Sequence, residues 1–226
     1  MSKINVVRIH NELLGTYGDR GNAEVLEFRG RYLGITVEII DISYEDSLPT
    51  NGDIYLLGGA EDAAQILSRE ALAKDLETIN LVLERGAVFL AVCAGFQILG
   101  NTFYADGKEQ KGLGLLDVDS IPGKKRFVGD VKSKYQDLDL QLTGFENHAG
   151  ETILSGDVKP LGKIEVGNGN GDGKFDGAIR ADERECGEHH RGQRSIQRET
   201  GKLSKARWVR RLLLSGFIRG GAPWRK

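Results

Sequence analysis

Residues 88–100 read V-F-L-A-V-C-A-G-F-Q-I-L-G, and this stretch decides the fold. A short apolar run ends at Cys93, and a helical pattern begins at Phe96. Short apolar runs that are followed by small residues are typical of buried parallel strands. Ala94 and Gly95 allow a tight strand-to-helix turn with Cys93 at its apex, which is the geometry of a nucleophile elbow. The alternative is an ordinary buried cysteine, the commoner role of a lone Cys.

A cysteine at this turn would lie at a helix N-terminus, where the helix dipole and free N–H groups stabilise an anion. A free thiol has a pKa of ~8.5, and such positions lower it. We therefore expect Cys93 to be activated as a thiolate.

The composition of the 226-residue chain is that of a globular protein, with 39% hydrophobic and 28% charged residues. Its formal net charge of -2 argues against a dedicated nucleic-acid binder. Its two cysteines, Cys93 and Cys186, exclude a disulfide scaffold or a zinc-finger framework. No apolar run is long enough to span a membrane, and the first residues do not resemble a signal peptide. We expect a cytoplasmic protein.

Charge divides the chain into two parts. Residues 1–179 contain 18 Lys and Arg against 28 Asp and Glu, whereas residues 180–226 contain 13 against 5. The second part is polar and then cationic and amphipathic over about residues 203–218. We therefore expect one domain over 1–179 and a basic tail of different character over 180–226.

The first part alternates between strand and helix patterns. Strands are expected at 4–9, 35–42, 53–57 and 88–92, and helices at about 23–33 and at 61–85, the second broken near Ser68. This order predicts an α/β fold with a mostly parallel central sheet and helices on both faces. Three special loops, at 15–22, at 58–61 and at Cys93, would then meet at the carboxyl ends of the strands, where ligands bind. After residue 112 we expect short, largely antiparallel strands that extend the sheet, with a turn at Pro122 and Gly123.

Five separated motifs resemble one enzyme family. The elbow A-V-C-A-G-F-Q-I-L-G is similar to the C-x-G-x-Q motif of class I glutamine amidotransferases. L-L-G-T-Y-G-D-R-G-N (13–22), G-G-A-E-D (58–62), K-R-F-V-G-D (125–130) and G-F-E-N-H-A-G (144–150) resemble the CobB/CobQ-like branch. Within that branch they look like the GatD-type glutaminase subunits of lipid II isoglutaminyl synthase. The resemblance covers about residues 4–179.

The resemblance implies a set of catalytic roles. Cys93 would attack the glutamine amide and form a γ-glutamyl thioester. The backbone N–H groups of Gly59 and Ala94 would hold the oxyanion, and Gln97 would contact the bound glutamine. The alternatives are an ordinary Gly-Gly turn and a polar residue on a helix face.

Two further residues carry implied roles. Asp19 would orient the catalytic histidine as the third member of the triad, and Arg126 would contact substrate. The alternatives are an Asx turn and an exposed charge on an edge strand. His148 also matches the branch, as a structural or site-lining residue.

The catalytic base is the one element that departs from the family's pattern. The family's histidine lies in a G-T-Y-L-H-G-P strand and loop about a dozen residues after an acidic-Gly pair. Counting from Asp176-Gly177 reaches His189, but the surrounding E-C-G-E-H-H-R shares nothing else with that motif. Either the sequence diverges and His189 or His190 serves as base, or the reading frame shifts near codon 180. Without a base this chain would be a weak or inactive glutaminase.

The resemblance also implies partners and an alternative acceptor. The chain would release ammonia from L-glutamine to a Mur ligase-like synthetase subunit (MurT), which would use ATP to amidate the D-glutamate of lipid II. No nucleotide loop or other cofactor motif is present, which fits this division of labour. The alternatives are a cobyrinate or cobyric acid-type amidotransferase, whose domain is usually fused to a synthetase, and a non-catalytic binding subunit.

Overall fold

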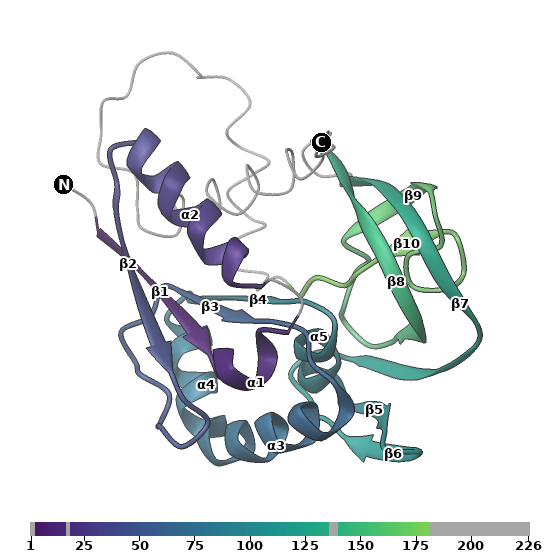
Figure 1. Cartoon of the computed structure of the whole chain (residues 1–226), viewed down its shortest axis with the longest axis horizontal. Helices are drawn as coiled ribbons and strands as arrows, with labels where there is room; N and C mark the ends of the chain where they lie inside the picture. The colour runs from purple at the N-terminus through teal and green to yellow at the C-terminus, as the bar shows by residue number, and fades with distance from the viewer. Residues whose placement is uncertain (1–2, 17–18, 136–139, 181–226) are drawn as a thin grey trace.

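The computed structural model describes residues 3–16, 19–135 and 140–180 (Figure 1). Up to the elbow the chain mixes strands and helices, in the order β1 (Lys3–Ile9), α1 (Asn11–Leu14), α2 (Arg20–Tyr32), β2 (Thr36–Ile42), β3 (Ile54–Leu57), α3 (Asp62–Leu72), the 3₁₀ helix η1 (Ala73–Asp75), α4 (Leu76–Glu84), β4 (Val88–Ala91) and α5 (Ala94–Leu99). Strands dominate afterwards: β5 (Thr102–Ala105), β6 (Lys108–Lys111), β7 (Val118–Tyr135), β8 (Leu140–Leu154), β9 (Gly162–Val166) and β10 (Phe175–Asp176).

The first four strands form a parallel sheet in the order β2-β1-β3-β4. Alternate residues of a strand face opposite sides of the sheet, so β1 contributes to two cores. Ile4 and Val6 pack with Ala23 and Leu26 of α2, whereas residues on the other face pack against α3 and α4. Helices therefore cover both faces, with α2 on one side and α3 and α4 on the other (Figure 1). The predicted α/β class with a parallel central sheet is confirmed.

The long helical stretch is broken, but not where the sequence suggested. Ser68 lies inside α3, and the break falls at η1, from Ala73 to Asp75. The Ser68 side chain is fully buried, and its Oγ lies 2.8 Å from Nδ1 of His10. A serine that is satisfied by a distant partner has no need to compete with the helix backbone, so the prediction of a break near Ser68 was wrong.

The later strands form a second sheet, in the order β10-β9-β7-β5-β6 with β8 paired to β7. The prediction that short strands extend the first sheet was therefore wrong. β7 and β8 are long antiparallel partners, and the chain passes through Pro122 and Gly123 with a register shift before Phe127 rather than with a turn. Pro122 is the last residue paired before the shift, and residues 123–126 of β7 face the single residue Ala149 of β8. A proline is tolerated at such an irregularity, because the regular ladder of hydrogen bonds is interrupted there.

Glu146 anchors a loop of the second sheet. The Glu146 carboxylate accepts hydrogen bonds from the backbone N–H groups of Asn168 (3.0 Å) and Gly169 (2.9 Å), and from Asn168 Nδ2 (2.7 Å), which fixes the glycine-rich loop after β9. No helix within the described ranges is both long and apolar enough to cross a bilayer.

Candidate functional site

The elbow predicted at Cys93 is present at the C-terminal end of β4. Cys93 has φ 53° and ψ −118° and is the residue that immediately precedes α5. A positive φ is uncommon for a residue with a side chain and is typical of functional turns. Gly95 is required here, because an added Cβ would lie 2.6 Å from Cβ of Leu57 in the neighbouring strand. The Cys93 residue is exposed to solvent. It is therefore displayed at the rim of the sheet rather than packed in the core.

The pKa of Cys93 differs from the expectation. Partial desolvation is the largest influence and raises the pKa of the thiol, and the carboxylates of Asp19 and Glu61 raise it further. Hydrogen bonds from the backbone N–H groups of Ala94 and Ala60 act in the opposite direction but do not overcome desolvation. The expected thiolate is thus not favoured by the described residues alone, and activation requires a base or cation near the sulfur.

The backbone N–H groups near Cys93 have different partners in this structure. The N–H groups of Ala94 and Ala60 lie by the Cys93 sulfur and lower the pKa of the thiol. The Gly59 N–H donates to Oδ2 of Asp19 at 2.8 Å. The assignment of Gly59 and Ala94 as the oxyanion donors therefore stays a prediction.

Asp19 lies at the start of α2, where its side chain makes no helix-capping hydrogen bond. It reaches the loop after β3 instead, and burial raises the pKa of its carboxyl while the Gly59 hydrogen bond lowers it. The close approach explains Gly58, since an added Cβ there would lie 2.5 Å from Cβ of Asp19 and would collide with the Leu14 carbonyl. The loop before α2 and the loop after β3 are therefore joined beside Cys93.

Gln97 lies one turn into α5, on the same short helix as Ala94. Its Oε1 accepts a hydrogen bond of 2.8 Å from Nε2 of Gln65. Gln65 is a site residue that the sequence motifs did not predict. The available signal was a polar residue on the core face of α3, which also carries the buried Ser68 and Leu72.

Arg126 and His148 lie on β7 and β8, outside the elbow. The Arg126 Nε donates to Oδ1 of Asn147 at 2.9 Å, and the Arg126 side chain is exposed. The His148 Nδ1 lies 2.8 Å from the Gly150 carbonyl oxygen, and its ring packs at a tilt on Phe127. His148 is therefore held by its own strand pair, as a structural or site-lining residue would be, while substrate contact by Arg126 stays a prediction.

The candidate base, His189, lies outside the described residues, as do His190, Cys186 and all but the first residue of the tail 180–226. The structure therefore describes the nucleophile, the donors and Asp19, but not the group that would take the thiol proton.

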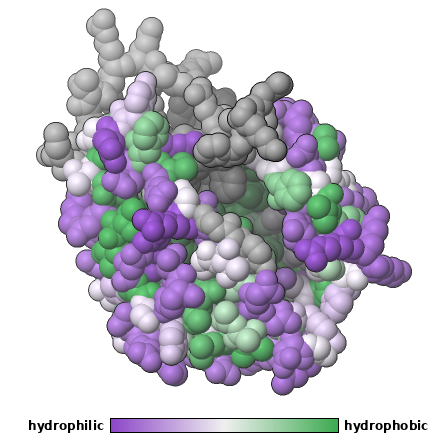
Figure 2. Space-filling view, in the orientation of Figure 1, coloured by the Kyte–Doolittle hydropathy of each residue, from purple (hydrophilic) through white to green (hydrophobic). Residues whose placement is uncertain are grey.

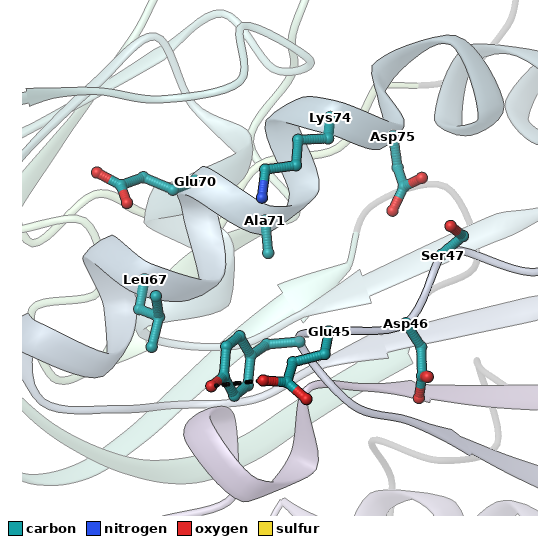
Figure 3. A pocket seen from close by; sticks show the side chains of 9 residues that line it. Glu45, Asp46, Ser47, Leu67, Glu70, Ala71, Lys74 and Asp75 are labelled. Atoms are coloured by element: carbon teal, nitrogen blue, oxygen red, sulfur yellow. Dashed lines mark hydrogen bonds between the residues drawn. The ribbon is translucent and has the colours of Figure 1, made fainter.

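Neither the cavity beside α3 nor any group of metal ligands in the described residues offers an alternative catalytic centre. A cavity of about 530 Å³ lies between residues 44–47 and the α3–η1 segment (Figure 3). Its acidic side chains include Asp46 and Asp75, whose carboxylates accept the backbone N–H groups of Ser43 and Leu48 and so hold the loop. Among the described residues, no three His, Cys, Asp or Glu side chains are grouped as metal ligands.

The space-filling view shows a hollow between the parallel-sheet side of the molecule and the β7–β8 side (Figure 2). Gln97 bridges these sides, because an added Cβ at Gly150 of β8 would lie 3.7 Å from Gln97 Nε2. The arrangement therefore offers an exposed sulfur, two N–H donors and an amide side chain at one rim. Chemically this suits attack on a carbonyl carbon with the oxygen held by backbone donors.

Comparison with known proteins gives a consistent result. A family model described as the CobB/CobQ-like glutamine amidotransferase domain matches residues 5–190. The GatD subunit of lipid II isoglutaminyl synthase (glutamine-hydrolysing) from Streptococcus pneumoniae is 37% identical over 175 residues, which are 76% of this chain and 67% of that protein. Cobyric acid synthase from Mesorhizobium japonicum is 29% identical over 165 residues, 69% of this chain and 32% of that protein.

A solved structure supports the fold. The structure of PurLQS from Thermotoga maritima matches with a TM-score of 0.56 and 18% identity, over 80% of this chain and 82% of the matched chain. At this identity the likeness bears on the fold alone.

Proposed function

Because this chain belongs to the CobB/CobQ-like glutamine amidotransferase family, we propose that Cys93 hydrolyses L-glutamine to glutamate and ammonia through a covalent thioester. The observation that carries the proposal is the backbone of Cys93, whose φ of 53° directs the sulfur out of the sheet toward the N–H groups of Ala60 and Ala94. A cysteine that is merely packed in a core has no reason to adopt this strained conformation.

The reaction follows from these groups. The Cys93 sulfur attacks the amide carbon, and the negative charge that develops on the amide oxygen is held by backbone N–H groups, those of Ala94 and of Gly59 in the loop after β3. The thiol proton passes to the base and then to the leaving nitrogen, which departs as ammonia. Water then cleaves the thioester and releases glutamate.

His189 is the residue we propose as base. The family match ends at residue 190 and so includes His189, which supports the assignment by position. The raised pKa of Cys93 gives the base a definite task, because an unassisted thiol would be mostly protonated at neutral pH. Asp19 would then act beside it, through its carboxylate near the sulfur.

The acceptor we propose is the D-glutamate of lipid II, amidated by a Mur ligase-like partner of the MurT type that consumes ATP. The support is the 37% identity to the GatD subunit of Streptococcus pneumoniae and the 31% identity to that of Staphylococcus aureus. The lower identity to cobyric acid synthase makes a corrin acceptor the second candidate. A neighbouring gene for a Mur ligase-like protein, or for corrin synthesis, would distinguish the two.

The alternative to His189 as base is a shift of reading frame near codon 180, in which case the residues after that point, His189 included, are not the native ones. The support is the reversal of charge balance there and the loss of family motifs. Translation of the coding DNA in its other frames tests this, since one of them should restore a histidine-bearing strand. A single uninterrupted frame with no such strand would refute it.

Ammonia release by the full chain tests the catalytic proposal, with the partner and without it. Cys93→Ala should lose at least about a thousandfold in activity, as removal of a nucleophile does elsewhere. Cys93→Ser is the matched variant, since it retains the size of the side chain but not the thiol, and it should be nearly as impaired. Ammonia release that survives in Cys93→Ala would overturn the assignment.

A further inference from the structure

Gln65 is a buried polar residue whose purpose the proposed function does not yet explain. It lies in the first half of α3 and is 2% exposed. A buried amide is costly unless it is hydrogen-bonded, so its partners show what it does. Nε2 of Gln65 donates to Oε1 of Gln97 at 2.8 Å and makes a longer contact of 3.4 Å to the Ala94 carbonyl oxygen. The shorter bond is the stronger one, and it joins α3 to the side chain of Gln97.

This bond decides which end of the Gln97 amide faces outward. A primary amide carries an acceptor oxygen at one end and two donor hydrogens at the other. Because Oε1 is engaged by Gln65, the Nε2 end is the one presented away from α3. It points toward β8, where an added Cβ at Gly150 would lie 3.7 Å from it. Gln97 itself is half-buried, so part of the residue stays exposed beside its neighbours on α3 and β8.

α3 also begins directly after the loop whose Ala60 N–H lies by the Cys93 sulfur. Gly95 N–H donates to the Gly58 carbonyl oxygen at 3.0 Å, which ties the same loop to the start of α5. The hydrogen bond from Gln65 to Gln97 adds a link through side chains, which joins α3 to α5. The orientation of Gln97 is therefore set by the helix that directly follows the loop after β3.

We infer that Gln65 is a positioning residue that fixes the Gln97 amide with its N–H donors toward the carboxylate of the bound glutamine. The inference rests on the proposed function, since it concerns recognition of that substrate. An amide N–H that meets a carboxylate makes a charge-assisted hydrogen bond. The reversed amide would place Oε1 against the carboxylate and repel it. Gln65 thus selects for substrate binding without touching the substrate.

Two variants test this. Gln65→Glu retains the size of the side chain but offers acceptor oxygens where Nε2 donated, so Gln97 must turn its Nε2 inward. Gln65→Met removes the donor without adding an acceptor and serves if the first variant does not fold. Gln141→Glu, an exposed glutamine on β8, is the control for the change of charge.

The readout is alkylation of Cys93 in the full chain, located by peptide mass spectrometry so that Cys186 is counted apart. A diazoketone analogue of glutamine uses the glutamine site, whereas iodoacetamide reports the sulfur alone. For Gln65→Glu we expect the half-saturating concentration of the analogue to rise about ten- to a hundredfold, the effect of one charge-assisted hydrogen bond. The iodoacetamide rate and the Gln141→Glu control should match wild type. Gln65→Met should fall between wild type and Gln65→Glu.

The double variant separates positioning from general damage. In a Gln97→Ala background, Gln65→Glu should add little further loss, because its effect acts through the missing amide. An unchanged half-saturating concentration in Gln65→Glu, or full additivity with Gln97→Ala, would overturn the inference. Wild type that is not labelled by the analogue at all would instead overturn the proposed function, so the two failures are distinguishable.

Discussion

Gly58 offers the sharpest test of how the site is built. An added Cβ at this position would lie 2.5 Å from both Cβ and Cγ of Asp19 and would collide with the Leu14 carbonyl oxygen. Non-bonded carbon atoms prefer about 3.5–4.0 Å, so the overlap is about 1 Å. Gly58→Ala must therefore push the loop after β3 away from Asp19.

The displacement has two measurable consequences. Overpacking of this size costs about 1–3 kcal/mol of unfolding free energy. The moved loop also breaks the 2.8 Å hydrogen bond between Gly59 and Asp19 and withdraws the Ala60 N–H from the sulfur. Loss of one oxyanion donor typically lowers kcat about a hundred- to a thousandfold. We expect Gly58→Ala to show both effects.

The assay is kcat/KM for ammonia release per folded molecule, with thermal unfolding measured alongside. Gly52→Ala is the matched control, because its Cβ would lie 2.5 Å from Cζ of Tyr55, at the opposite end of β3 from Cys93. It should lose similar stability and keep its activity per folded molecule. Gly129→Ala has no atom within 4 Å and should change neither quantity. Gly58→Ala with near wild-type activity, or Gly52→Ala with the same catalytic loss, would refute this account of the loop.

Three further predictions concern titration and loop anchoring. Because the pKa of Cys93 is raised, the rate of its alkylation by iodoacetamide should keep rising above neutral pH, and a plateau below neutrality would contradict this. Asp19→Asn removes a nearby negative charge and should shift this pH profile to lower pH. Burial lowers the pKa of His10 below 6.5, so the unfolded chain takes up the proton first. Stability should be full above that pH and fall as pH drops through the folded-state value, by at most about 1.4 kcal/mol per pH unit, and His10→Asn should flatten this slope in thermal unfolding. Burial raises the pKa of Glu146, but its hydrogen bonds outweigh burial and hold the pKa below its ordinary value, so the stabilisation it gives is present above that ordinary value and is lost in acid. Glu146→Gln should lower the free energy of unfolding by about 1–3 kcal/mol near neutrality and remove the acid-dependent loss, whereas an unchanged denaturant midpoint would count against the loop anchor.

The sequence was sufficient for the parallel sheet and for the elbow. Both are encoded locally, by apolar runs at 88–92 and at the earlier strands and by the small residues after Cys93. Each prediction needed only the period of the hydrophobic pattern and the steric permission that Ala94 and Gly95 give.

The second sheet was harder to foresee, because its pairing is not local. Pro122 and Gly123 are typical of a turn, and only the partner β8 shows that the chain continues through them with a register shift. Strand register depends on long-range partners and leaves a weak trace in a single sequence.

The N–H groups of the loop after β3 lie between these cases. The glycine pair marked the correct loop, but the choice between two neighbouring N–H groups depends on where Asp19 lies. Gln65 was missed for a related reason. A glutamine on a helix reads as surface, and its burial follows from the partner Gln97, 32 residues away.

Acid-quenched mass spectrometry of the full chain during turnover of L-glutamine tests the central claim most directly. We predict a glutamyl adduct on the peptide that contains Cys93, lost on treatment with hydroxylamine and absent in Cys93→Ser. Ammonia released without any adduct at Cys93, or an adduct carried by another residue, would contradict the account.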